Sequence, residues 1–366
     1  MIALWKKRGV SALLFPFSRI YGGVVAVRNR KYDRHRDRTA RLPARVISVG
    51  NITVGGTGKT PLVIFLAERL QKRGHGVAVL SRGYGRMTRH VHAVPDGRDA
   101  PADPAESGDE PALMARRLDG IPVVVGKDRV SASRMCIQRY GSDMLILDDG
   151  FQHRRLGRDL DIVVIDAREP FGNRWLLPAG PLREPLFVLS RAGAVVLSRS
   201  DQAGAGLEEI IREIRRRTAA PVFLARHRAR DWIGIPENGT LPLESLAGRS
   251  CFAFSGIGHP DAFRETLRET GVDIAAFLRY PDHHRYRERD LKRVLREAEK
   301  HGASAILTTE KDGVRIPRFW CPHIPVYALR IDFELMDKED DLIRMIEKKE
   351  RFREEIHAEK TDYGGG

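Results

Sequence analysis

The segment SVGNITVGGTGKTPLVIFLAERL, residues 48–70, predicts a β-strand, a glycine-rich turn and an α-helix in that order. β-Branched residues at 46–49 are typical of a buried strand, and the apolar residues after Pro61 recur at helical spacing. This is the layout of a P-loop, in which backbone N–H groups and a helix N-terminus surround a polyphosphate. The lysine of such a loop contacts the β- and γ-phosphate oxygens, and the Ser or Thr that follows holds Mg²⁺. The alternative is a glycine-rich turn that only connects a strand to a helix.

The phosphate-binding residues that this layout predicts are consecutive: Gly55, Gly56, Thr57, Gly58, Lys59 and Thr60. Thr60 is also a predicted Mg²⁺ ligand. The sequence departs from the strict pattern at Thr53, where a P-loop has its first glycine. Gly-Lys-Thr between a strand and a helix still favours a nucleotide phosphate over a plain turn.

The chain has 366 residues, which is long enough for two domains that each have their own core. Its net charge of +14 is concentrated at the N-terminus, where residues 1–45 contain twelve Lys or Arg and only two Asp. The rest of the chain is only mildly basic, which argues against a large nucleic-acid-binding face. The three cysteines are far apart and match no metal-ligand spacing, so we expect reduced thiols.

Residues 1–40 form a basic segment that is rich in apolar and aromatic side chains. Its uncharged runs, 9–18 and 20–27, are each shorter than the roughly 18 residues that span a bilayer, and no convincing signal-peptide cleavage site precedes the basic cluster. We therefore expect an interfacial segment on an anionic membrane surface, with its apolar side in the acyl boundary and its Lys and Arg on the headgroups. The alternative is a helix packed on the protein's own core.

Strand and helix patterns alternate from residue 45 to about residue 200. The predicted strands are Val46–Val49, Val77–Leu80, Val123–Val125, Met144–Leu147, Ile162–Ile165 and Ala194–Leu197, with helices at Glu110–Leu118 and Arg129–Tyr140. The alternation predicts an α/β fold of the P-loop NTPase type, with a mostly parallel sheet covered by helices on both faces. We expect the functional site at the carboxyl ends of the strands.

A second, smaller α/β pattern begins near Cys251, and the segments 221–232 and 326–335 that flank it are predicted to pair as a two-stranded linker. We therefore divide the chain into four parts. They are a membrane-associating segment (1–40), a P-loop core (41–220), a smaller α/β domain with the linker strands (221–335) and a charged helical tail without an assigned role (336–366).

Two adjacent carboxylates, Asp148 and Asp149, follow a short apolar strand. A P-loop enzyme keeps there the acid that binds Mg²⁺ together with the Lys-Thr of its loop. An Asp-Asp-Gly sequence after a strand is by itself usually a turn. Because a Gly-Lys-Thr loop follows a neighbouring strand, we favour a metal site.

A second acidic pair, Asp109 and Glu110, lies just before a predicted helix in the sequence SGDEPALMA. Asp at such a position can cap the helix, since its carboxylate accepts hydrogen bonds from free N–H groups. It can equally serve as the base that accepts a hydroxyl proton, as Asp does in kinases. The residues alone leave both alternatives open.

Two further segments carry polar groups that suit a binding site. RYPDHHRYRERD places His283 and His284 beside Asp282, and a histidine there could orient an acid from the other domain. Exposed loop histidines are the alternative. The proline-rich loop at 171–192 contains Arg183 and Glu184; such loops are stiff, and an arginine could hold a phosphate or a sugar hydroxyl.

These segments together resemble the tetraacyldisaccharide 4'-kinase family, the lipid A kinases of Gram-negative bacteria. The matching segments, in order, are VGNITVGGTGKTP, LSRGYGR, GDEP, VGKDR, LDDGFQHRRL, LLPAGPLREP, FSGIGHP, PDHHRY and TTEKDGV. The resemblance extends from the basic N-terminus to about Leu335 and includes the Thr53 departure. One such segment would be weak support, whereas nine in the same order are specific.

The resemblance implies a membrane-associated kinase that transfers the γ-phosphate of ATP, with Mg²⁺, to the 4'-hydroxyl of a lipid A disaccharide 1-phosphate precursor. It implies that the enzyme acts at the cytoplasmic face of the inner membrane and does not bind nucleic acid. It gives no information on protein partners. By motif, Lys59 serves catalysis and ATP binding, Asp148 and Asp149 bind metal, and Asp109 is the base, assisted by His283. The expected substrate-binding residues are Glu110, Arg129, Gln152, His153, Arg183 and Glu184.

Two other classes of protein compete with this interpretation. A P-loop ATPase that acts as a partner-regulated switch would share the Gly-Lys-Thr loop, but its hydrolysis would respond to a protein rather than to a glycolipid. A non-enzymatic basic protein that binds membranes or nucleic acid is disfavoured, because the positive charge lies apart from the loop. DNA binding with a steep salt dependence would support that class.

Overall fold

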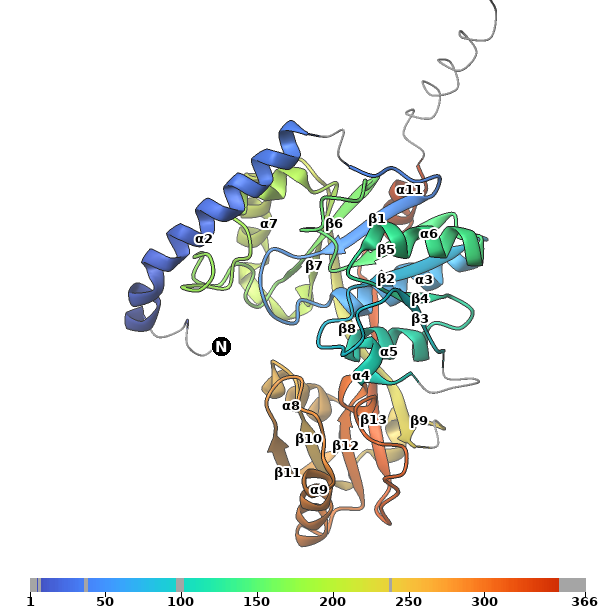
Figure 1. Cartoon of the computed structure of the whole chain (residues 1–366). Helices are drawn as coiled ribbons and strands as arrows, with labels where there is room; N and C mark the ends of the chain where they lie inside the picture. The colour runs from blue at the N-terminus through green and yellow to red at the C-terminus, as the bar shows by residue number, and fades with distance from the viewer. Residues whose placement is uncertain (1–4, 6–7, 36–38, 97–101, 237–238, 349–366) are drawn as a thin grey trace, which may run out of the picture.

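The computed structural model describes residues 5, 8–35, 39–96, 102–236 and 239–348. Figure 1 shows a larger first lobe, with strands β1–β7 and the helices around them, above a smaller second lobe, with β9–β12 and helices α8–α10. Two long strands, β8 (Val222–Ile235) and β13 (Val326–Leu335), run from one lobe to the other.

The first lobe confirms the predicted alternation of strands and helices. Its strands are β1 (Arg45–Gly50), β2 (Val77–Ser81), β3 (His92–Val94), β4 (Val123–Val125), β5 (Met144–Asp148), β6 (Leu160–Asp166) and β7 (Ala194–Ser198). Its helices are α2 (Arg8–Arg34), α3 (Lys59–Lys72), α4 (Pro104–Ser107), α5 (Asp109–Arg117), α6 (Arg129–Tyr140), α7 (Leu207–Arg215) and α11 (Glu339–Glu347). The short β3 and α4 are not visible in the sequence pattern.

The second lobe contains β9 (Thr240–Pro242), β10 (Ser250–Ser255), β11 (Asp273–Arg279) and β12 (Ala305–Thr309). Its helices are α8 (Pro260–Glu269), α9 (Glu288–Lys300) and the single turn α10 (Glu310–Gly313). Strand β10 lies between β11 and β12, parallel to both, so this lobe repeats the α/β pattern on a smaller scale.

The sheet is continuous through both lobes, in the order β11-β10-β12-β13-β8-β7-β6-β1-β5-β2-β4-β3, with β9 paired to β8. Strands β8 and β13 pair with each other antiparallel, which confirms the two-stranded linker. The linker is not a free ribbon, because β8 also pairs parallel with β7 and β13 pairs parallel with β12. The remaining pairs of the first lobe are parallel except β3 with β4, as the sequence predicts.

The central strands of the first lobe are buried on both faces, which explains their near-continuous apolar sequences. The described part of the charged tail, α11, packs on α3. Its residues Leu342, Ile343 and Ile346 belong to the same buried cluster as Leu62 and Leu66 of α3. The tail beyond residue 348 lies outside the described residues.

The N-terminal helix α2 corrects one expectation. The two uncharged runs join into one helix through Pro16 and Arg19, because an exposed arginine on a helix surface need not end an apolar stretch. Gly9–Arg34 is the one helix in the described part of the chain that is long and apolar enough to cross a bilayer, with a mean hydropathy of 1.6 over an 18-residue window. Only 17% of its apolar window is buried. The length argument against a membrane span therefore fails.

Candidate active site between the two lobes

The glycine-rich loop connects β1 to α3 and has the backbone that its sequence predicts. Gly55 and Gly58 take positive φ angles of 119° and 90°, and Gly58 precedes the first residue of α3, Lys59. A Cβ on Gly58 would lie 2.7 Å from Nε2 of His227 on the linker strand β8, so the site also excludes any side chain. Thr57 is buried, and its carbonyl accepts a 2.8 Å hydrogen bond from the Ser198 hydroxyl. The loop is thus fixed from two neighbouring strands.

The departure at Thr53 has a structural explanation. Thr53 forms a β-bridge with Leu182, and the Val54 N–H donates to the Pro181 carbonyl at 2.8 Å. Thr53 is not among the residues with positive φ, so no glycine is required there. The same pairing brings the proline-rich loop, with Arg183 and Glu184, against the glycine-rich loop.

Lys59 and Asp149 face each other at the carboxyl ends of β1 and β5. Lys59 Nζ lies 3.5 Å from Asp149 Oδ1, and Arg183 Nη1 lies 2.9 Å from both oxygens of the same carboxylate. Burial opposes ionisation, but the charges of Lys59 and Arg183 lower the pKa of Asp149 to about 2. Asp149 takes φ 52°, a strained conformation that is common at functional sites. Its carboxylate is therefore ionised and already paired.

Asp148 has a different environment from its neighbour. It is buried, and its Oδ2 accepts a 3.0 Å hydrogen bond from the Ser81 hydroxyl. Burial, followed by the charge of Asp149, raises the pKa of Asp148 to about 6. A carboxylate in this state would be stabilised by a cation, which fits an Mg²⁺ ligand. Within the described residues no group of three or more His, Cys, Asp or Glu could hold a metal, so protein carboxylates alone do not complete a site.

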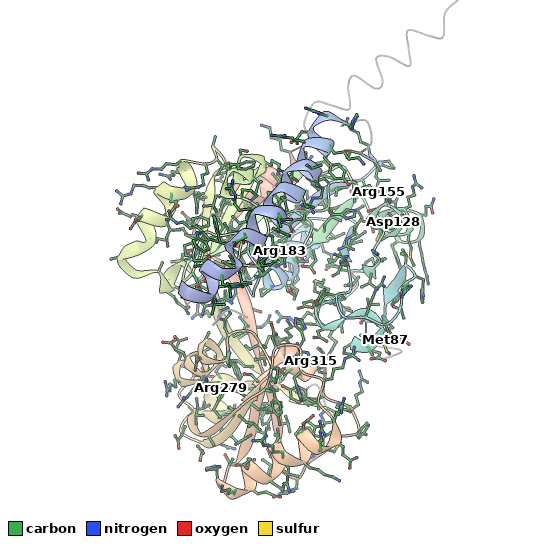
Figure 2. The ribbon with its side chains drawn as sticks, turned by 60° about the vertical axis from the view of Figure 1, so that its left-hand side comes forward. Met87, Asp128, Arg155, Arg183, Arg279 and Arg315 are labelled. Carbon is green, nitrogen blue, oxygen red and sulfur yellow. The ribbon has the colours of Figure 1, made fainter. Side chains whose placement is uncertain are left out.

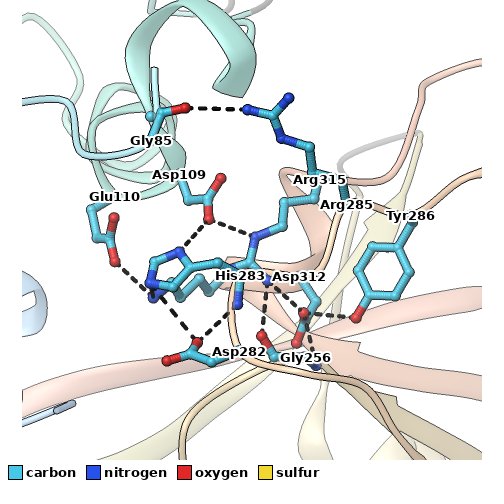
Figure 3. A network of polar contacts seen from close by, with 12 residues as sticks. Gly85, Asp109, Glu110, Gly256, Asp282, His283, Arg285, Tyr286, Asp312 and Arg315 are labelled. Carbon is cyan, nitrogen blue, oxygen red and sulfur yellow. Dashed lines mark hydrogen bonds and ion pairs between the residues drawn. The ribbon is translucent and has the colours of Figure 1, made fainter. Parts of the chain in front are cut away.

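Asp109 is brought against the second lobe by its place at the start of α5 (Figure 3). Its Oδ2 lies 2.9 Å from Nδ1 of His283 and 2.8 Å from Nε of Arg315. Burial would raise the pKa of Asp109, but the hydrogen bond with His283 and the charge of Arg315 lower it. The cap of α5 is Gly108, which has no side chain to offer, and the Asp109 carboxylate turns to the other lobe instead.

Glu110 makes a second contact between the lobes. Its Oε1 lies 2.7 Å from Nζ of Lys311, and Lys311 Nζ lies 3.5 Å from Nε2 of His283. His283 has φ 59°, so the residues that face Asp109 include a second strained position. Glu110 also contributes to the raised pKa of Asp148, which links this group to the strand-end carboxylates.

Gln152 and Glu184 lie behind the glycine-rich loop. Gln152 Nε2 donates to the Asn51 carbonyl at 2.9 Å and lies 3.4 Å from Glu184 Oε2. Glu184 is fully buried and is held by Arg28 and Asn29 of α2 at 3.1 and 3.0 Å, and by Arg191 at 2.7 Å. Glu184 thus ties the N-terminal helix to the site. Figure 2 shows the neighbouring Arg183 beside α2 and Arg315 at the edge of the second lobe that faces the first.

Arg129 is a buried polar residue at the start of α6, and His153 is a partly buried one in the loop after β5. Burial lowers the pKa of Arg129 to about 10, and burial with the Arg129 charge lowers the pKa of His153 to about 4. Among the described residues, Nε of Arg129 and Nε2 of His153 have no hydrogen-bond partner. Buried polar atoms without a partner are uncommon and suit a site that binds a polar ligand.

Comparison with known proteins identifies the family of this chain. Residues 10–351 match the family model described as tetraacyldisaccharide-1-P 4'-kinase. The chain belongs to this family. A tetraacyldisaccharide 4'-kinase of Syntrophus aciditrophicus is 44% identical over 340 residues, covering 90% of this chain and 91% of that protein. One from Anaeromyxobacter sp. (strain Fw109-5) is 44% identical, with 93% and 92% covered.

A solved structure of the family supports the fold. The crystal structure of LpxK from Aquifex aeolicus, titled an "apo" form in complex with ATP, is 32% identical and aligns with a TM-score of 0.75. The alignment covers 92% of this chain and 98% of the crystallised one. The chain is therefore a kinase with a P-loop-like fold that uses ATP and Mg²⁺, as the sequence predicts.

Sequence reasoning missed the contributions of Lys311, Asp312 and Arg315 to the site. Lys311 and Asp312 lie in the segment TTEKDGV, which enters the sequence analysis only through the family resemblance, and Arg315 follows its last residue. The charged residues of this segment alternate within one turn, α10, which gives no periodic signal. The only available signal was the density of charges next to a predicted strand end.

Proposed function

We propose that this protein transfers the γ-phosphoryl group of ATP to the 4'-hydroxyl of a tetraacyldisaccharide 1-phosphate, as a membrane-bound step of lipid A biosynthesis. The observation that carries the proposal is the contact of Asp109 with His283 across the lobes, in a chain with the family's P-loop. A hydroxyl acceptor needs a base that takes its proton, and a carboxylate can do this. Asp109 belongs to the first lobe, and residues of the second lobe hold its carboxylate in place.

In this reaction the acceptor oxygen forms a bond to the γ-phosphorus while the bond from that phosphorus to the ADP oxygen breaks. The hydroxyl proton passes to Asp109, whose lowered pKa keeps it ionised near neutral pH. Lys59 and the backbone N–H groups of Gly55–Thr60 would hold the phosphates. Mg²⁺, when bound, would neutralise charge on the transferring phosphoryl group.

The metal would be held by Thr60 and by the pair Asp148 and Asp149. Asp148 is the better direct ligand, because its only hydrogen-bond partner among the described residues is Ser81. Asp149 is paired with Arg183 and Lys59, so it would bind the ion only if these contacts rearranged. We therefore regard Asp149 as the weaker of the two metal ligands.

The acceptor would be recognised by polar groups around the strand ends. Arg129 and His153 carry unpartnered nitrogens that suit hydroxyl or phosphate oxygens. Arg183 would bind the nucleotide phosphates. Gln152, Glu184 and Glu110 would hold the side chains next to them in position.

We place the enzyme at the cytoplasmic face of the inner membrane, because ATP is on that side and the acceptor carries acyl chains. The exposed apolar face of α2, with Leu13, Phe17, Ile20, Val24 and Val27, supports contact with lipid. The helix has the length to insert, and its basic residues suit anionic headgroups.

The test is transfer from labelled ATP in mixed micelles that contain Mg²⁺ and a tetraacyldisaccharide 1-phosphate. The expected product is a labelled glycolipid that chromatography separates from ATP and inorganic phosphate. Lys59→Met is the matched control, and we expect it to lose transfer while staying folded. Hydrolysis of ATP without labelled lipid would contradict the proposal and favour a P-loop ATPase switch.

A further inference from the structure

Arg315 is a buried arginine from the second lobe that reaches the carboxylate of Asp109. Its side chain is 3% exposed, and its Nε lies 2.8 Å from Asp109 Oδ2 (Figure 3). Residue 315 follows β12 and the turn α10, whereas Asp109 begins α5 of the first lobe. The two residues are 206 positions apart in the chain, so the contact exists only when the lobes are packed as they are here.

The guanidinium of Arg315 is itself held in place by groups of the second lobe. Its Nη1 donates to the Gly256 carbonyl at 2.9 Å and to Asp312 Oδ1 at 3.1 Å. Asp312 is fully buried and also accepts from the Tyr286 hydroxyl at 2.8 Å and the Gly256 N–H at 3.0 Å. A planar guanidinium fixed by these partners offers its Nε in one direction.

We propose that Arg315 is a positioning residue for phosphoryl transfer: it fixes the Asp109 carboxylate through Oδ2 so that Oδ1 is free to accept the proton of the acceptor hydroxyl. The inference rests on the proposed kinase function. In the part of the chain that the structure describes, both hydrogen bonds to the Asp109 side chain, from His283 and from Arg315, go to Oδ2. One oxygen is held and the other is left for chemistry.

A purely structural role does not account for the burial of Arg315. Its Nη2 is buried and has no hydrogen-bond partner among the described residues. An unpaired donor of a buried charged group costs free energy, so its burial needs an explanation beyond the packing of the lobes. The lobes have another buried arginine contact, Arg117 with Glu310 at 2.9 Å and Asp332 at 2.8 Å, that ties α5 to the second lobe without touching Asp109.

The charges that face Asp109 come from two segments of the second lobe. Arg315 and Lys311 belong to the segment after β12, and His283 belongs to the loop after β11. All three lower the pKa of Asp109 against the effect of burial. Loss of Arg315 should therefore raise the pKa of Asp109. Because the ionised carboxylate is the active form, the acidic limb of the kcat profile should move to higher pH.

The experiment compares Arg315→Met with Arg117→Met in the full chain, using the labelled transfer assay from pH 3 to pH 8 at saturating substrates, because the lowered pKa of Asp109 places the wild-type limb at the acidic end of this range. For Arg315→Met we expect kcat to fall about 10- to 100-fold near neutral pH, since misplacement of a reacting group by about 1 Å costs on this order. KM for ATP should stay within about twofold of wild type, and the loss of kcat should be largest at the acidic end of the pH range. Arg117→Met should keep the wild-type limb even if its Tm falls.

A second variant protects the test against misfolding. Arg315→Lys keeps the positive charge but replaces the planar guanidinium by one ammonium nitrogen, which cannot occupy the positions of both Nε and Nη1. We expect its acidic limb to stay near the wild-type position while kcat remains reduced. An unshifted limb in folded Arg315→Met, or equal losses in Arg315→Met and Arg117→Met, would overturn the inference.

A readout without turnover separates this inference from the proposed function. The ¹³C signal of the Asp109 carboxyl, identified by its loss in Asp109→Asn, is titrated in wild type and Arg315→Met. The pKa should be higher in the variant. If wild type shows no lipid phosphorylation, the proposed function fails, and this titration still decides whether Arg315 controls Asp109. Identical titrations in both proteins would refute that control.

Discussion

The exposed face of α2 allows a quantitative test of membrane binding. Leu13, Ile20 and Val24 lie on one side of the helix and are 76%, 67% and 65% exposed. We expect the triple substitution Leu13→Gln, Ile20→Gln and Val24→Gln to release the protein from vesicles. Glutamine is a good helix former, so the helix itself should persist.

The size of the effect follows from the exposed fractions. Full burial of a Leu, Ile or Val side chain is worth about 1.5–3 kcal/mol, and about two-thirds to three-quarters of each side chain remains available for burial in lipid. Each substitution then removes about 1–2 kcal/mol, and three remove about 4 kcal/mol. At 1.4 kcal/mol per tenfold change, the partition coefficient should fall on the order of 10³-fold.

The substitutions leave the packed side of α2 intact. That side is formed by Ser18, whose hydroxyl donates to the Leu176 carbonyl at 2.6 Å, and by Tyr21, whose hydroxyl donates to the Arg183 carbonyl at 2.9 Å. Deletion of residues 1–27 would break these contacts beside the active site as well. The point substitutions therefore separate lipid binding from the structure of the site.

The assay is co-sedimentation of full-length protein with anionic and with zwitterionic vesicles at low and high salt. Phe319→Gln is the matched control, because Phe319 is 81% exposed but lies on the second lobe. Basic residues near the surface add about 1 kcal/mol each on anionic vesicles, and this part should weaken with salt. Equal sedimentation of the triple variant and wild type would refute the role of this face and leave α2 as a packed helix.

Three further predictions concern the site itself. Asp109→Asn should lower kcat about 10²- to 10⁴-fold with little change in KM for ATP, and adding His283→Ala should cost less than the sum of the single losses, because the two residues act as one unit; fully additive kinetics would contradict this. Asp148→Asn should raise the Tm of the protein without Mg²⁺, since burial raises the pKa of Asp148 to about 6 and its charge is costly, and it should abolish the rise in Tm on adding Mg²⁺ with ATP; an unchanged Mg²⁺ response by thermal shift would exclude its ligand role. Gly58→Ala should abolish ATP binding by calorimetry, because its φ of 90° and the 2.7 Å approach to His227 leave no room for a methyl group, and retained affinity would show that the loop can move.

The sequence identified those parts of the site that are local in the chain. The P-loop and the strand that ends in Asp148 are each encoded within a few residues, by a glycine-rich turn or an apolar run, so their positions at the sheet edge could be predicted. The contact of Asp109 with His283 was also predicted, but only because the family resemblance supplied the pairing. Nothing local to either residue specifies a partner 174 positions away.

Other parts of the site depend on packing between segments that are distant in the chain. The carboxylate of Glu184, a predicted substrate-binding residue, is buried and pairs with Arg28, 156 residues away. The Glu184 carboxylate therefore joins α2 to the proline-rich loop. Neither the periodicity nor the spacing of residues in the sequence can predict such a pairing. The continuity of α2 through Arg19 was missed for another reason, since a count of uncharged residues cannot tell which side of a helix a charge occupies.

The three candidate carboxylates, Asp109, Asp148 and Asp149, differ in their affinity for a proton and in the groups that surround them. Asp149 is paired with Lys59 and Arg183, and its pKa of about 2 makes it a poor proton acceptor. Asp148 has a pKa of about 6 and would be the stronger base alone, but a cation at the site would remove that basicity. The pKa of Asp109 is also lowered, but only one of its oxygens is held by the second lobe, and the other lies outside those contacts. Basicity by itself would select Asp148, whereas geometry selects Asp109, and in phosphoryl transfer positioning contributes more than proton affinity.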